Sequence, residues 1–231
     1  ITLTSKIILG STFWLSVIGV LLLVACEPSL RSLSTDDRWL AAVFQVMAAL
    51  TTVGFNSVPI ANLSQASLFL LILLMVIGAS PSGTGGGLET TTFAALLGVM
   101  RSAMRNSQRV YFGGKEIPPA RVRLAMASLG FYTGALIVGC FLLALVENHG
   151  FEDLLFEASS ALGTVGLSTG ITAQLTSMGK AIIIGLMFFK GVLASLAGPS
   201  PNYDMQRILA TRNPREASLM NGMVTGVLRA I

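Results

Sequence analysis

The 231-residue sequence has few charged side chains, two cysteines and one histidine. Only 11% of its residues are charged, against roughly 25% in a typical soluble domain, and 53% are hydrophobic. This balance excludes an ordinary soluble domain and favours a protein of the lipid bilayer. Cys26, Cys140 and His149 are too few and too scattered to form a disulfide framework or a metal centre.

Two long runs contain no charged side chain, residues 7–26 and residues 124–146. Each has the roughly 20 residues that a helix needs to cross about 30 Å of hydrocarbon, so we expect two spanning helices. A signal peptide is the alternative for the first run, but Cys26-Glu27-Pro28 lacks the small residues of a cleavage site. The sequence opens on Ile1 rather than methionine, which is compatible with a fragment.

One short motif occurs twice, as Thr51-Thr52-Val53-Gly54 and as Gly163-Thr164-Val165-Gly166. Each copy follows a short amphipathic segment, residues 39–50 or 151–162, and precedes a longer apolar one. When the two copies are aligned, residues 44–75 match residues 156–187 at about 11 of 32 positions without a gap, which indicates an internal duplication. The order of span, half-helix, turn and span is that of a pore loop, whose backbone carbonyls replace the water around a cation.

The second apolar segment of the first unit, residues 66–100, contains a break rich in glycine. Its candidate gate residues are Gly78, Ser80, Gly83, Thr84, Gly85, Gly86 and Gly87, with Pro81 among them. Glycine costs about 1 kcal/mol and proline about 3 kcal/mol inside a helix, so the helix should break within the membrane. Such backbone persists only where protein buries it or where it lines a water-filled path. The alternatives are a gate and a kinked helix whose glycines pack against neighbours.

Charge predicts the orientation of both turns. Basic residues gather between the two units, at Arg101, Arg105, Arg109, Lys115, Arg121 and Arg123, against one acid, Glu116. The positive-inside rule makes residues 101–121 a cytoplasmic loop and residues 201–231 a cytoplasmic tail. Acidic residues precede each turn instead, so both turns should face outward. The basic residues adjoin membrane spans, which favours lipid headgroups as their partner and argues against nucleic acid.

Together, the segments 52–57, 85–93 and 163–168 resemble the Trk/Ktr/HKT superfamily of potassium transporters. The resemblance covers residues 7–197 and corresponds to the last two of the four repeats of that family. It implies an all-α integral membrane fold with two helix–pore-loop–helix repeats of a pseudo-fourfold, potassium-channel-like pore. The first repeat has a helix at 7–26, a half-helix at 39–50, a filter at 51–57 and a broken helix at 66–100. The second has a helix at 124–146, a half-helix at 151–162, a filter at 163–169 and a helix at 179–198.

The resemblance also implies the roles of residues. Potassium would bind to backbone carbonyls of the filter residues Thr51, Thr52, Val53, Gly54, Gly163, Thr164, Val165 and Gly166. Each turn has one glycine where the potassium-channel signature has two, so we expect fewer ion sites and potassium transport with some sodium. Family members usually carry a lysine where this chain has Glu89. Their pore arginine aligns with Gly191, so Lys190 either supplies that pore charge or faces protein away from the pore.

Two repeats cannot close a fourfold ring, so the missing part must be N-terminal repeats or a second copy of the chain. The resemblance implies a homodimer with a cytosolic nucleotide-binding regulatory subunit, located as a multi-pass protein in the cell membrane, the inner membrane in bacteria. It implies no enzyme and no covalent cofactor, with the potassium ion as cargo. The competing hypotheses are an intramembrane serine protease that uses Ser80 and His149, and a non-conducting scaffold half of a transporter.

Overall fold

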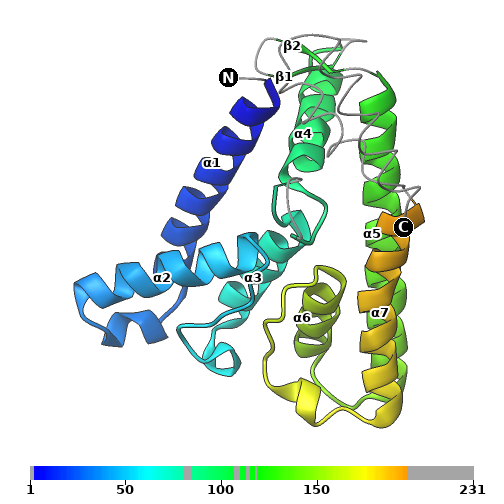
Figure 1. Cartoon of the computed structure of the whole chain (residues 1–231). Helices are drawn as coiled ribbons and strands as arrows, with labels where there is room; N and C mark the ends of the chain where they lie inside the picture. Colours follow the sequence, from blue (N-terminus) through cyan, green and yellow to red (C-terminus); the bar gives the residue numbers. More distant parts are fainter. Residues whose placement is uncertain (1–2, 81–84, 107–109, 113–114, 118, 197–231) are drawn as a thin grey trace, which may run out of the picture. The chain divides into compact units, whose positions relative to one another are not determined.

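The computed structural model describes residues 3–80, 85–106, 110–112, 115–117 and 119–196. The elements in chain order are α1 (Leu3–Cys26), η1 (Ser29–Ser32), α2 (Thr35–Leu50), η2 (Ile60–Asn62), α3 (Gln65–Ile77), α4 (Thr90–Met104), β1 (Tyr111–Phe112), β2 (Lys115–Glu116), α5 (Pro119–Val146), α6 (Phe151–Leu162), η3 (Ile171–Ala173) and α7 (Ser177–Leu196) (Figure 1). The packing described below concerns the compact unit that ends at Phe189.

The described residues are mostly helical, but the expectation of an all-α chain needs one correction. Between α4 and α5 two short strands pair antiparallel, with Tyr111 opposite Glu116. Both flanking helices extend into the predicted basic loop of residues 101–121, because α4 continues to Met104 and α5 begins at Pro119. Proline at a first helical position has no N–H to leave unpaired, so it begins α5 ahead of the uncharged run.

The two pore-loop units predicted from the sequence have the same spacing between their helices. The half-helices α2 and α6 end at Leu50 and Leu162, and α3 and α7 begin at Gln65 and Ser177, so the same offset along the chain relates both pairs. In the first unit α1, α2 and α3 pack on one another, and in the second α5 packs on α6. Contacts of α3 with α6 and of α4 with α5 join the units. Each of the two larger apolar cores is centred on one unit and takes in residues of the other, such as Phe156 in the first core and Leu88 in the second.

The half-helix α2 begins before the position expected from its apolar residues. It starts at Thr35 rather than Trp39 because Ser34 caps it, with the Ser34 hydroxyl accepting a hydrogen bond from the Asp37 N–H at 3.3 Å. Asp36 and Asp37 also place negative charge in the first turn, where the helix dipole favours it. Local capping thus overrides the start that the apolar residues alone suggest.

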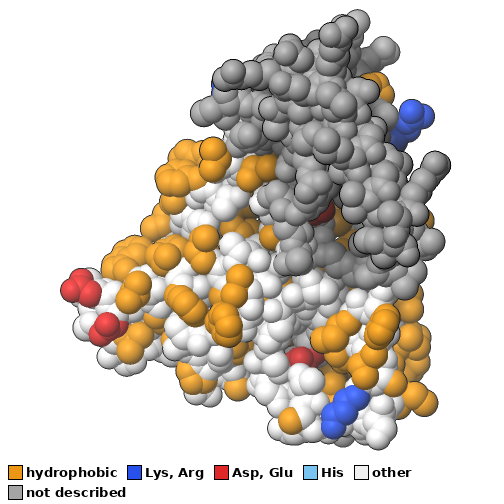
Figure 2. All heavy atoms as spheres, viewed as in Figure 1, with side chains coloured by type: hydrophobic (Ala, Val, Ile, Leu, Met, Phe, Trp, Pro, Cys, Tyr) orange, Lys and Arg blue, Asp and Glu red, His pale blue; other side chains and the backbone are white. Residues whose placement is uncertain are grey.

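Two described helices are long and apolar enough to cross a membrane, Lys6–Cys26 within α1 and Val122–Val146 within α5. Large apolar side chains along both are exposed, among them Trp14 of α1 and Phe141 of α5. Figure 2 shows hydrophobic side chains spread widely over one face of the molecule, with few charged side chains between them. Such surfaces suit contact with lipid or with further protein in a bilayer.

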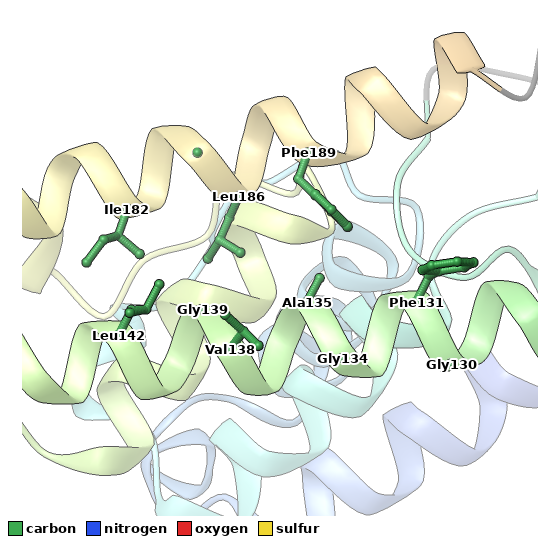
Figure 3. Close-up of a pocket in the computed structure, with 11 residues that line it drawn as sticks. Gly130, Phe131, Gly134, Ala135, Val138, Gly139, Leu142, Ile182, Leu186 and Phe189 are labelled. Carbon is green, nitrogen blue, oxygen red and sulfur yellow. The ribbon is translucent and has the colours of Figure 1, made fainter.

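An apolar groove of about 450 Å³ lies between α5 and α7 (Figure 3). The two helices touch at Gly139, where an added Cβ would lie 2.6 Å from Leu186 Cδ2. At Gly134 no atom of the described part of the chain lies within 4 Å of such a Cβ, so the helices leave space there. The absence of a side chain at Gly139 therefore sets how closely α5 and α7 approach.

Candidate functional site

The two Thr-Val-Gly turns have the same backbone conformation. Thr52 and Thr164 have positive φ angles of 57° and 51°, and Gly54 and Gly166 follow with φ angles of 77° and 94°. Positive φ is unfavourable for a β-branched residue such as threonine, and it persists only where the surroundings impose it. The same strained residue therefore recurs at the same place in both units.

The N–H groups of each turn point back into the preceding half-helix. Val53 N–H donates to the Ala48 carbonyl at 3.1 Å, and Val165 N–H donates to the Ser160 carbonyl at 2.9 Å. Within the described part of the chain, no hydrogen bond ends on a carbonyl oxygen of residues 51–54 or 163–166. These carbonyls are therefore free to accept another partner, and a row of free carbonyls is what a dehydrated cation needs.

The turns lie against each other at Gly54. A Cβ added to Gly54 would collide with the Val165 carbonyl oxygen and would lie 3.2 Å from the Gly166 Cα. The same addition at Gly166 meets no atom of a described residue within 4 Å. Position 54 thus requires glycine both for its φ angle and for the approach of the second turn.

The described part of the glycine-rich break touches both turns. Gly86 N–H donates to Thr52 Oγ1 at 2.9 Å in a buried hydrogen bond. The Gly86 backbone also lies directly against the Gly163 carbonyl, and an added Cβ would lie 2.7 Å from Thr164 Oγ1. The break is therefore packed against the two turns rather than separated from them.

Hydrogen bonds replace the helix where the break interrupts it. Ala79 N–H donates to the Gly86 carbonyl at 3.1 Å, and Leu88 N–H donates to the Val76 carbonyl at 2.9 Å. Gly87 adopts a positive φ angle of 80°. The N–H groups of Ala79, Gly86 and Leu88 thus have partners inside the protein, which is how irregular backbone is accommodated within a membrane.

The other predicted site residues lie around this arrangement or outside the description. Gly78 is buried and ends α3, and Ser80 follows it, half-buried. Gly83, Thr84 and the side chain of Lys190 lie outside the described residues. Among the described residues no hydrogen bond joins Ser80 to His149, which follows α5, so the contact that a serine protease needs is not formed.

Two of the acidic residues that precede the turns, Glu27 and Glu147, are buried, and their carboxylates bind the chain just before α3 and α7. Glu27 accepts the Ser64 N–H at 2.8 Å, and Glu147 accepts the Thr176 N–H at 2.9 Å. Ser64 and Thr176 are related by the same offset as the two turns. The two glutamates do not keep this offset, because both the connection after α1 and the half-helix α2 are longer than their counterparts in the second unit. A comparison at fixed offset therefore misses them.

The pKa of Glu27 is lowered from its ordinary value although the side chain is buried. Burial works to raise the pKa, but hydrogen bonds from the Ser64 N–H, the Ser67 side chain and both donors of Ser29 favour the ionised form and outweigh it. Glu27 therefore acts as a charged acceptor that ties α1 to the start of α3.

Comparison with known proteins gives the family. The family described as "TrkH: Cation transport protein" matches residues 3–193. Relatives include the Ktr system potassium uptake protein B of Vibrio alginolyticus, 36% identical over 79% of this chain and 41% of its own length. Another is the potassium/sodium uptake protein NtpJ of Enterococcus hirae, 36% identical over 81% of this chain and 43% of its own length.

A solved structure has a similar fold. The crystal structure of the potassium transporter TrkH from Vibrio parahaemolyticus matches with a TM-score of 0.65 at 20% identity, over 82% of this chain and 44% of that one. The chain thus spans about two fifths of the length of the curated relatives it matches, 41% in the first. Because the family match extends over most of the chain, the protein belongs to the TrkH family of cation transport proteins.

Proposed function

We propose that this chain forms half of a potassium uptake pathway that also admits some sodium. The carbonyl oxygens of Thr51, Thr52, Val53 and Gly54, and of Gly163, Thr164, Val165 and Gly166, replace the hydration shell of the ion. The observation that carries the proposal is the pair of turns with similar backbone angles, which lie against each other with their carbonyls unbonded among the described residues. The names of the relatives, potassium and potassium/sodium uptake proteins, support the choice of ion.

The glycine-rich break acts as the gate of this pathway. The contacts of Gly86 with Thr52 and Gly163 support this role, because a segment that touches both turns can obstruct a path between them. Gly78, Ser80, Gly85 and Gly87 complete the described part of the gate. Lys190 supplies a positive charge to the pore in the second repeat.

Two further repeats complete the ring, from an N-terminal part of the polypeptide or from a second copy. This chain spans 41% of the length of the first relative, close to the half that two of four repeats would occupy. This supports an N-terminal part of the same polypeptide as the source of the other two repeats. The complete protein assembles as a homodimer in the bacterial inner membrane. A cytosolic nucleotide-binding subunit contacts the basic residues between α4 and α5.

Rubidium uptake into proteoliposomes tests this proposal, with the complete four-repeat protein. Gly54→Ala should abolish uptake, because the new Cβ forces the first turn away from the Val165 carbonyl. Gly166→Ala has a similarly unfavourable φ but no clash with any residue that the structure describes, so it should reduce uptake less. Normal uptake in both variants would overturn the filter assignment.

The same preparation separates the competing functions. A scaffold half predicts no uptake even when all four repeats are present. A serine protease predicts that Ser80→Ala removes cleavage of a membrane substrate and leaves ion flux intact. The proposed pathway predicts uptake in the wild type and no cleavage in either protein.

A further inference from the structure

The half-helix α6 carries a buried carboxylate, Glu157, that contacts the chain just after the second turn. Glu157 accepts hydrogen bonds from the Ser168 and Thr172 hydroxyls, each at 2.6 Å. It also accepts the Thr169 N–H at 3.0 Å and the Thr169 hydroxyl at 3.4 Å. All four partners are neutral donors, and this carboxylate forms no ion pair with any described residue. Its four hydrogen bonds instead hold residues 168–172 against α6.

The second turn is therefore attached to α6 on both sides. Upstream, Val165 N–H donates to the Ser160 carbonyl at the end of the helix. Downstream, Glu157 binds Thr169 and Thr172. Because both attachments belong to one rigid helix, the carbonyls between them have little freedom to move.

The downstream attachment of the first turn to its half-helix is weaker. When the two turns are aligned, Gln45 takes the place of Glu157, and Ile60 takes the place of Thr172. Gln45 Oε1 accepts only the Ser57 N–H, at 3.3 Å, and its buried Nε2 has no partner among the described residues. Hydrogen bonds to a charged acceptor are roughly twice as strong as those between neutral groups. The second turn is thus the more firmly held of the two.

We propose that Glu157 is the positioning residue that sets how sharply the pathway discriminates potassium from sodium. This inference rests on the proposed filter function. A ring of carbonyls discriminates by its size or by the number and strength of its dipoles, and each depends on how firmly the carbonyls are held. Glu157 does not contact the ion; it acts through Thr169 and Thr172.

Sodium competition against rubidium uptake tests this role in proteoliposomes of the complete protein. In Glu157→Gln the amide turns its own donors toward the loop hydroxyls, so sodium should inhibit uptake at a several-fold lower concentration. Thr172→Val removes one hydroxyl donor and should make sodium inhibit at a lower concentration as well. Thr172→Ser keeps the hydroxyl and should show the sodium competition of the wild type. Gln45→Ala, the matched change in the first unit, should have a much smaller effect.

Amide hydrogen exchange provides a readout that does not depend on flux. Residues 168–172 should exchange faster in Glu157→Gln, and residues 56–60 should not. If Glu157→Gln fails to fold, the Thr172 pair decides the question alone. Unchanged sodium competition in Glu157→Gln or Thr172→Val, or failure of Thr172→Ser to restore it, would overturn the inference and leave the pathway intact. A wild type without any uptake would overturn both.

Discussion

Gly86 and Thr52 share a buried hydrogen bond, in which the Gly86 N–H donates to Thr52 Oγ1 at 2.9 Å. Thr52 lies in the first turn, and Gly86 lies in the glycine-rich break 34 residues later. A change in the break is therefore transmitted directly to a residue of the proposed filter.

Thr52→Val should destabilise the protein by about 1–3 kcal/mol, because it leaves the buried Gly86 N–H without its acceptor. Thr164→Val is the matched control, since Thr164 has nearly the same φ angle, is exposed and makes no hydrogen bond with its hydroxyl to a described residue. Thermal unfolding in detergent, followed by tryptophan fluorescence, measures the difference. Equal unfolding temperatures for the two variants would show that the contact contributes no stability.

Gly86→Ala should lower both stability and rubidium uptake, because the added methyl group collides with the Gly163 carbonyl. Backbone cannot yield as a flexible side chain does, so the two segments must separate. Gly134→Ala is the control, because the methyl group there enters open space. If Gly86→Ala unfolds and transports like Gly134→Ala, the break does not lie against the second turn.

The loss of stability at acidic pH should depend on Glu27. Its folded-state pKa lies below the ordinary value of 4.5, so the ionised side chain stabilises the fold above that pH. This contribution is lost as the pH falls through the lower, folded-state pKa. The gap in unfolding temperature between the wild type and Glu27→Gln should be constant above pH 4.5 and should narrow below it. A gap that stays constant throughout acidification would contradict the assignment.

Gly139→Leu should destabilise the protein by about 1–3 kcal/mol, the usual cost of overpacking a tight contact. The new side chain must displace Leu186, which is buried on α7. Gly134→Leu places the same side chain in the neighbouring space and should be tolerated. Thermal unfolding of the two variants compares them, and equal losses would place the close approach of α5 and α7 elsewhere.

The family and the mostly helical fold were predictable from sequence. Their signals, the uncharged runs and the repeated turn, are continuous stretches of sequence that can be recognised without knowing the tertiary packing. The positions of the turns after Leu50 and Leu162 follow from the same signal. The roles of Glu27 and Glu157 were not predictable. Their charges indicate a side of the membrane, but their burial depends on distant segments, such as Ser64, 37 residues from Glu27. The contact between Gly86 and Thr52 depends on tertiary packing in the same way.

The central claim, that carbonyls of the two turns bind the transported cation, is tested most directly by rubidium bound in crystals of the complete protein. Anomalous difference density should appear between the turns, within coordination distance of carbonyls of residues 51–54 and 163–166. It should be lost when sodium replaces rubidium. Rubidium density confined to another part of the protein, under conditions that sustain uptake, would contradict the account.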